Sequence, residues 1–161
     1  MPWVFVRPAM SEKHVPERAR QKVIDRARGC CEYCRSQMHY SPDPFSVEHV
    51  LPRSRGGGNA LSNLALSCQG CNNLKFTSIE ALDPISGVMA PLYHPRQHQW
   101  SEHFLWSEDF ALIIGRTPTG RATIERLQIN REGVVNLRRV LIFNWSSPAG
   151  IDLRLIGKLR V

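Results

Sequence analysis

The sequence predicts an α+β fold, with two short strands and two helices in a compact unit and a further α+β segment after it. Three observations support this prediction. Two Cys-x-x-Cys pairs flank the segment that holds the two strands. Within this segment, an alternating apolar and polar run is followed by a Gly-rich loop. Segments rich in helix formers lie before and after the strands. The expected elements are a helix at 16–28, strands at 45–51 and 64–66, and a helix from Gln69 to about Ile79.

The composition is that of a globular protein, with 42% hydrophobic and 22% charged residues in 161. No run approaches eighteen consecutive apolar residues, so no transmembrane helix is expected. The first residues, M-P-W-V-F-V-R-P-A-M, lack a basic stretch before the apolar ones, and we therefore expect no signal peptide and a cytoplasmic protein. We divide the chain into a tail at 1–14, a domain at 15–80 and a C-terminal extension of unknown role at 81–161.

The formal net charge is +7. A basic surface attracts polyanions and neutralises phosphates, which favours nucleic acid as the partner. The charge alone fits equally well with a basic protein that binds no nucleic acid. The motifs must decide between these readings.

The cysteines favour a metal site over disulfides in a protein expected to be cytoplasmic. Cys31 and Cys34 form one pair, Cys68 and Cys71 form a second pair of the same spacing, and 33 residues separate the pairs. Two such turns present four thiolates to one tetrahedral zinc ion, which leaves no open position for water and is therefore structural. Cys30 could replace Cys31 with a wider turn, but the symmetric pairing is preferred.

The segment between the cysteine pairs predicts a hairpin that brings the pairs together. Glu48 and His49 lie near the end of the first strand, and their side chains are expected to point toward opposite faces of the sheet. Pro52 ends the strand, and the loop P-R-S-R-G-G-G-N-A-L-S-N cannot hold regular structure. Its three glycines at 56–58 allow close approach of the backbone to a ligand.

The extension predicts a second set of elements. Residues 111–115 and 121–127 are expected to form two strands joined by a T-P-T-G turn. Asn130 is expected to cap a helix that runs to about Phe143. Residues 151–161 alternate as a strand would. Trp100, Phe104 and Trp106 predict an aromatic cluster that packs in the interior more readily than it stacks on bases.

The pieces R-A-R-G-C-C-E-Y-C, V-E-H-V-L-P-R-S-R-G-G-G, L-S-N-L-A-L-S-C and C-N-N-L-K, in this order, resemble the HNH endonuclease family. The resemblance covers about residues 18–78 and matches the variant in which the last motif position is Asn. It implies the ββα-metal fold, that is, strand, loop, strand and helix. The segment P-L-Y-H-P-R-Q-H-Q-W-S-E-H-F-L-W looks like an extension found in some bacterial HNH proteins.

The resemblance also implies a site. His49 would be the general base that takes a proton from the attacking water. Glu48 and Asn72 would bind a catalytic Mg²⁺ or Mn²⁺, which prefers oxygen ligands. Asn63 would fix the loop and orient the histidine ring. The family more often has Asp than Glu before the histidine, and Asn73 is an alternative to Asn72 if the helix is rotated.

The remaining candidates are cationic and imidazole side chains. Arg53, Arg55 and Lys75 are expected phosphate contacts, although solvated surface charges would look the same in sequence. Three histidines lack a tight ligand spacing, so roles in packing and solvation are favoured over a second metal site: His94, His98 and His103.

Three functions follow from this reading. The first is a metal-dependent endonuclease that hydrolyses DNA phosphodiester bonds, with double-stranded DNA as the partner. The second is a zinc-stabilised nucleic-acid-binding module without catalysis, and the third is a nuclease that acts on RNA or on single strands. A single site cuts one strand at a time, so cutting both strands would need a homodimer or sequential nicks.

Overall fold

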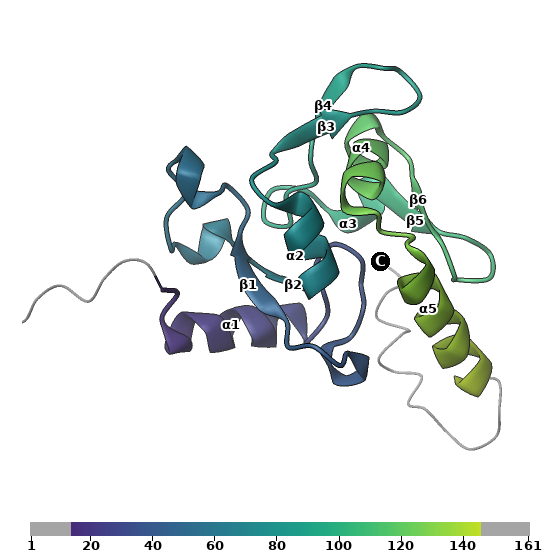
Figure 1. The fold of residues 1–161 in the computed structure, drawn as a ribbon, viewed down its shortest axis with the longest axis horizontal. Coiled ribbons are helices and arrows are strands. Elements are labelled where there is room, and N and C mark those ends of the chain that lie inside the picture. The colour runs from purple at the N-terminus through teal and green to yellow at the C-terminus, as the bar shows by residue number, and fades with distance from the viewer. Residues whose placement is uncertain (1–13, 146–161) are drawn as a thin grey trace, which may run out of the picture.

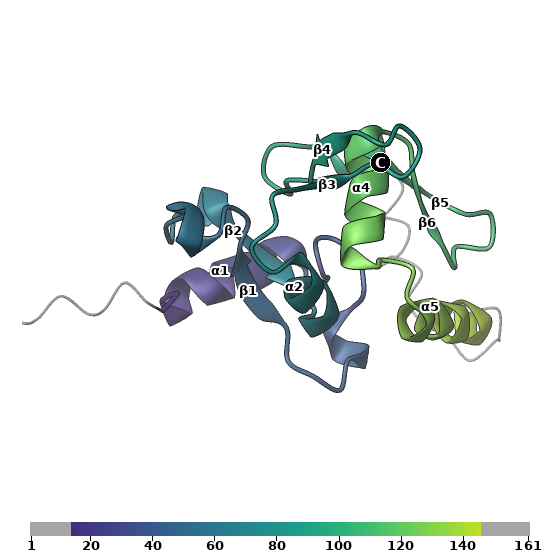
Figure 2. The same cartoon turned by 45° about the horizontal axis from the view of Figure 1, so that its top comes forward.

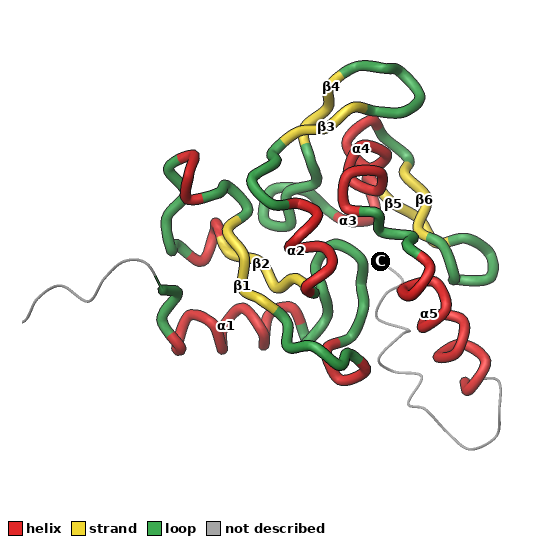
Figure 3. The backbone as a smooth tube through the Cα atoms, viewed as in Figure 1, coloured by secondary structure: helices red, strands yellow, loops and turns green. Residues whose placement is uncertain are grey.

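The computed structural model describes residues 14–145. It is a mixed α+β fold with small antiparallel sheets, as predicted (Figures 1 and 3). Its elements in chain order are α1 (Glu17–Ala27), β1 (Ser46–His49), β2 (Leu64–Ser67), α2 (Gln69–Lys75), β3 (Glu80–Leu82), β4 (Met89–Pro91), α3 (Trp100–His103), β5 (Phe104–Trp106), β6 (Ile113–Gly115), α4 (Pro118–Leu127) and α5 (Glu132–Trp145). The strand expected at 151–161 lies outside the described residues.

The first half is the expected strand, loop, strand and helix. β1 and β2 pair antiparallel, with Glu48 opposite Ala65 and His49 opposite Leu64. α1 packs on β2 and α2 packs on β1, and both views place α2 between α1 and the extension (Figures 1 and 2). All four residues of β2 are buried, which anchors the hairpin in the core. α2 ends at Lys75, four residues earlier than predicted.

The first helix was predicted correctly. It begins after Pro16, whose fixed φ suits a helix start, and it ends where Arg28 takes a left-handed conformation with φ 52°. Val23 is its fully buried residue. Arg26 donates to the main-chain oxygens of Leu61 (3.0 Å) and Leu64 (2.7 Å), which ties the helix to the start of β2.

The strand predicted at 111–115 is present as β6, but the prediction that T-P-T-G joins it to a second strand at 121–127 was wrong. β6 pairs instead with β5, which precedes it, and residues from Pro118 form the helix α4. Thr117 caps this helix by accepting from the Gly120 amide at 3.1 Å, and Pro118 occupies the first turn. A Cβ on Gly120 would lie 2.1 Å from the main-chain oxygen of His103, so this glycine serves close packing rather than a turn.

The helix near residue 130 exists, but Asn130 has a different role from the expected cap. Its side chain accepts from the Ile113 amide (2.9 Å) and donates to the Ile113 carbonyl oxygen (2.7 Å). Asn130 therefore continues the hydrogen bonding of β6, and α5 begins two residues later, at Glu132.

The extension packs directly against the cysteine-containing half. Arg96 forms an ion pair with Glu32, and the indole of Trp100 donates to the main-chain oxygen of Tyr33 at 3.5 Å. Trp100 also packs against Phe104 and Trp106, with ring centroids 5.2 and 5.7 Å away, so the aromatic cluster lies in this contact. No helix within residues 14–145 is both long and apolar enough to cross a membrane. The division at residue 80 stays a prediction.

Candidate metal centre and active site

The four paired cysteines converge at one buried point. The Sγ atoms of Cys31, Cys34, Cys68 and Cys71 all lie within 4.8 Å of one another, and those of Cys34 and Cys68 are 3.6 Å apart. Zinc–sulfur bonds of about 2.3 Å in a tetrahedron place sulfurs about 3.8 Å apart. The cluster therefore fits one zinc ion. Cys30 lies outside it, with its Sγ 3.6 Å from the main-chain oxygen of Arg28.

Local backbone structure positions each pair. The Cys31 amide donates to the Ser36 carbonyl at 2.8 Å, which closes the first turn. Cys68 is the N-cap of α2 and accepts from the Cys71 amide at 3.5 Å. Glu32 joins the two turns, because its amide donates to the Leu66 carbonyl and its carboxylate accepts from the Leu66 amide, both at 2.9 Å.

The chemistry of the cluster also fits a metal. Burial raises the pKa of the Cys31 thiol well above its usual range. A thiolate at this place therefore requires a nearby cation, and a metal ion that binds four thiolates provides it while releasing their protons. Zinc is the ion that the all-sulfur donor set favours.

His49 stands at the end of β1, half-buried, where its ring is held by a loop residue. Its Nε2 lies 2.7 Å from Oδ1 of Asn59, and Nη1 of Arg53 donates to the same oxygen at 3.5 Å. The Asn59 amide nitrogen donates to the main-chain oxygen of His14 at 3.3 Å. Asn59 was not among the predicted site residues. The polar residue directly after three glycines was the one available signal.

Asn63 holds the loop closed. Its Oδ1 accepts from the Leu51 amide (2.7 Å), and its Nδ2 donates to the carbonyl oxygens of Leu51 (3.1 Å) and Gly58 (3.0 Å). A Cβ on Gly57 would lie 1.7 Å from the Leu51 oxygen, so only glycine fits beside the hydrogen-bonded side chain of Asn63. Asn63 thus fixes the path of the loop that carries Asn59.

Glu48 points the other way from His49 along β1, as the alternation predicts, and is buried. One carboxylate oxygen accepts from the Tyr33 hydroxyl and the other lies 3.0 Å from Nζ of Lys75. Burial raises the pKa of Glu48, and the Lys75 ammonium opposes this shift. Burial, with the Glu48 charge added, raises the pKa of Tyr33 well above its usual range, so Tyr33 stays a donor. Tyr33 was not among the predicted site residues.

Two further predicted site residues lie on α2: Asn72, the expected metal ligand, and Lys75, an expected phosphate contact. Asn72 is half-buried, and within residues 14–145 its side chain has no hydrogen-bond partner, which leaves its amide oxygen available. Asn73 is exposed. Lys75 is 1% exposed, and it also donates to the His49 carbonyl at 3.3 Å, so a phosphate contact would require it to leave Glu48.

The arginines expected to contact phosphate are exposed on the loop. Arg53 adjoins the His49 and Asn59 pair, whereas Arg55 donates from Nε to the Thr77 carbonyl at 3.2 Å, beside the end of α2. The three histidines of the extension lie close together, with the rings of His98 and His103 4.7 Å apart. Within the described part of the chain the paired cysteines are the group that could hold a metal, and no histidine belongs to it.

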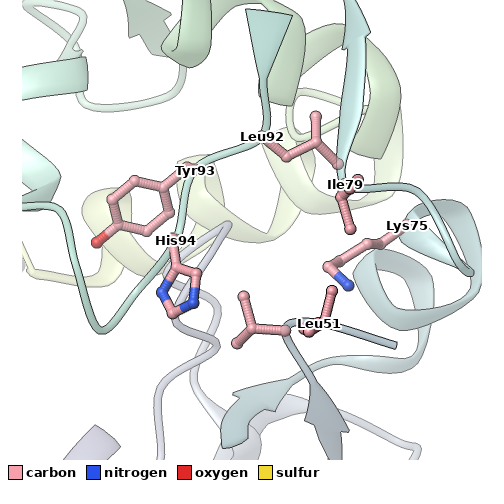
Figure 4. Close-up of a pocket in the computed structure, with 7 residues that line it drawn as sticks. Leu51, Lys75, Ile79, Leu92, Tyr93 and His94 are labelled. Atoms are coloured by element: carbon pink, nitrogen blue, oxygen red, sulfur yellow. The ribbon is translucent and has the colours of Figure 1, made fainter. Parts of the chain in front are cut away.

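A small cavity of about 130 Å³ lies where the extension meets α2 and β1 (Figure 4). Its lining is mainly apolar, with Lys75 and His94 on opposite sides. Sites for small molecules measure about 300–1,000 Å³. The cavity is too small for such a ligand, and His49 is not part of its wall.

Two short antiparallel strands, a loop and a helix, with a histidine at the end of the first strand, define the ββα-metal class of domain. The sequence model of the HNH endonuclease family matches residues 31–77. This stretch of the chain therefore matches the HNH endonuclease domain that the resemblance implied. Searches of curated proteins and of solved structures gave no match.

Proposed function

We propose that the protein is an endonuclease that hydrolyses the phosphodiester bonds of DNA, with His49 as the general base. The observation that carries this proposal is the hydrogen bond between His49 Nε2 and Asn59 Oδ1. The HNH domain supports the nuclease class. We add to this class that the substrate is DNA and that the protein cleaves it.

The hydrogen bond determines which ring nitrogen acts. Oδ1 of an amide only accepts, and Arg53 donates to the same atom, so His49 Nε2 carries the proton and donates. Nδ1 is then the basic nitrogen, with its lone pair available to take a proton from water as the oxygen attacks phosphorus. Asn59 maintains this tautomer and the ring orientation, and Asn63 maintains the loop that carries Asn59.

A divalent ion belongs to this proposal, with Asn72 and Glu48 as its protein ligands. When bound, it would stabilise the charge that develops on the phosphate and the leaving oxygen. The amide oxygen of Asn72 fits Mg²⁺ or Mn²⁺ as the structure stands. Glu48 does not, because Tyr33 and Lys75 engage both of its oxygens, and it could join only by exchanging the Lys75 ammonium for the ion.

DNA is the substrate we favour, because the net charge is +7 and the exposed Arg53 and Arg55 lie on the loop next to His49. The engaged state of Glu48 is the observation that favours the second candidate function, a zinc-stabilised module that binds nucleic acid without cutting it. RNA and single strands are alternative substrates for the same His49 chemistry.

The test is nicking of supercoiled plasmid with Mg²⁺ or Mn²⁺, on protein of known zinc content. The wild type is compared with His49→Ala and with His39→Ala, which removes an exposed histidine in the turn before β1. We expect nicking by the wild type and by His39→Ala, and its loss in His49→Ala at unchanged zinc content. Folded, zinc-loaded wild type that cuts neither duplex DNA, single strands nor RNA would favour the binding module.

A further inference from the structure

Arg131, in the turn before α5, reaches back to the cysteine cluster from a distant part of the chain. Its Nη2 donates to Sγ of Cys68 at 3.2 Å and its Nη1 lies 3.7 Å from Sγ of Cys71. The approach depends on the turn between these cysteines, since a Cβ on Gly70 would lie 2.5 Å from Arg131 Nη2. A glycine in the second cysteine turn thus makes room for a guanidinium beside two metal-binding sulfurs.

A second arginine reaches the cluster through the backbone of Cys34. Arg138 of α5 is 8% exposed, donates from Nη2 to the Cys34 carbonyl at 2.9 Å, and places its guanidinium 5.2 Å from the centre of the Trp106 ring. Its other donors reach the Ala111 and Ile129 carbonyls and the Asn130 side chain. Within residues 14–145, neither Arg131 nor Arg138 has a carboxylate within 4.0 Å.

Arg138 is buried and Arg131 is half-buried, and a cation shielded from water is costly unless it has an anionic partner. The anion that both arginines face is the sulfur cluster. Four thiolates around one Zn²⁺ carry a net charge of −2, and two guanidinium groups bring the sum to zero. Four neutral thiols would leave both arginines without a counter-charge.

We propose that Arg131 and Arg138 are positioning residues for the zinc centre, which neutralise the zinc–tetrathiolate charge and hold its sulfurs by N–H···S hydrogen bonds and through the Cys34 carbonyl. The extension therefore contributes to metal binding in the HNH domain, although all four ligands lie before residue 72. This proposal concerns zinc affinity and is independent of whether the protein cuts DNA.

The test is zinc competition with a chromogenic chelator on the full chain. Arg131→Gln, Arg131→Lys and Arg138→Lys are compared with Arg126→Gln, which removes an equal charge from the exposed face of α4, where Arg126 donates to Ser78. Loss of partners that surround metal ligands weakens metal binding by about 10- to 100-fold. We expect a loss of this size for Arg131→Gln, a smaller one for either Lys variant, and none for Arg126→Gln.

Cobalt substitution adds a readout that a merely structural arginine would not change. An N–H···S bond stabilises sulfur electrons, so its loss in Arg131→Gln should move the sulfur-to-cobalt charge-transfer band to longer wavelength. Equal zinc affinity and an unshifted band in folded Arg131→Gln would overturn the proposal. If Arg131→Gln does not fold, the Lys variants decide by the same two measurements, and wild-type values in both would overturn it.

Discussion

The ammonium of Lys75 lies 3.0 Å from a carboxylate oxygen of Glu48, and both side chains are nearly excluded from solvent, at 1% and 5% exposed. The pair links the last residue of α2 to the strand that carries His49. It also occupies the carboxylate that the HNH resemblance assigns to a metal ion. The same residue pair therefore bears on both the stability of the domain and the catalysis that we propose for it.

Removing one member of this pair should be strongly destabilising. Lys75→Met leaves a buried carboxylate without its cation, and breaking buried pairs of this kind costs about 3–5 kcal/mol. Urea unfolding at constant zinc content measures the change. The double variant Lys75→Met/Glu48→Gln removes both charges while Tyr33 keeps an acceptor, so it should be more stable than Lys75→Met alone. Equal loss in both variants would show that charge is not the reason.

Asn59→Ala should slow nicking without unfolding the protein. The His49 ring loses the acceptor at 2.7 Å that maintains its tautomer and orientation. Misplacing a catalytic group by about 1 Å lowers rates by up to about 100-fold. Plasmid nicking rates are compared with those of Asn136→Ala, an exposed asparagine on α5. A wild-type rate for Asn59→Ala would exclude the tautomer argument.

Two adjacent glycines offer a matched pair of variants. Gly57→Ala would place a Cβ 1.7 Å from the Leu51 oxygen and 2.8 Å from the Asn63 amide, whereas a Cβ on Gly58 meets nothing within 4 Å. We expect Gly57→Ala to lower the free energy of unfolding by about 1–3 kcal/mol. Gly58→Ala should change it by less than about 0.5 kcal/mol. Chemical denaturation measures both, and equal stabilities would show that the loop moves freely.

The ion pair of Asp83 and Arg121 should make stability depend on pH. Hydrogen bonds from Arg121, at 2.7 and 2.8 Å, lower the pKa of Asp83 below its usual range, and Ser86 adds to this. A carboxyl whose pKa is lower in the folded state stabilises the fold above its unfolded pKa, near 4, and that stabilisation is lost as the pH falls below it.

The difference in melting temperature between wild type and Asp83→Asn should therefore be largest above about pH 4. It should become smaller as the pH falls below this value. Comparing the two proteins at each pH removes the effect of zinc loss in acid, which both share. A difference that stays constant from pH 7 to pH 3 would contradict the assignment.

Local patterns were sufficient where a short range of sequence carried the whole signal. The equal spacing of the two cysteine pairs predicted one four-sulfur site, and the Gly-rich interruption after His49 predicted the hairpin that joins them. The helix after Pro16 followed from its composition. Each depends on chain geometry within a few residues, or on a requirement such as tetrahedral coordination that any fold must meet.

The error at 121–127 shows how such patterns fail. A strand was expected at R-A-T-I-E-R-L because T-P-T-G was taken as a hairpin turn, but the Thr117 cap, Pro118 and the packing of Gly120 against His103 produced a helix. Tertiary context overrode a weak propensity, because the free energy of packing exceeds the small differences between residue propensities.

Long-range partners depend on the folded arrangement alone. No pattern in the chain indicates that Lys75 meets Glu48, that Asn59 holds His49, or that Arg131 approaches Cys68. These contacts form because the hairpin, α2 and the extension pack against one another. The same packing buries charged side chains that the sequence alone would place in solvent. The residue types of the site can be read from the sequence, whereas the partner of each charged group is decided by tertiary packing, because burial makes an unpaired charge costly.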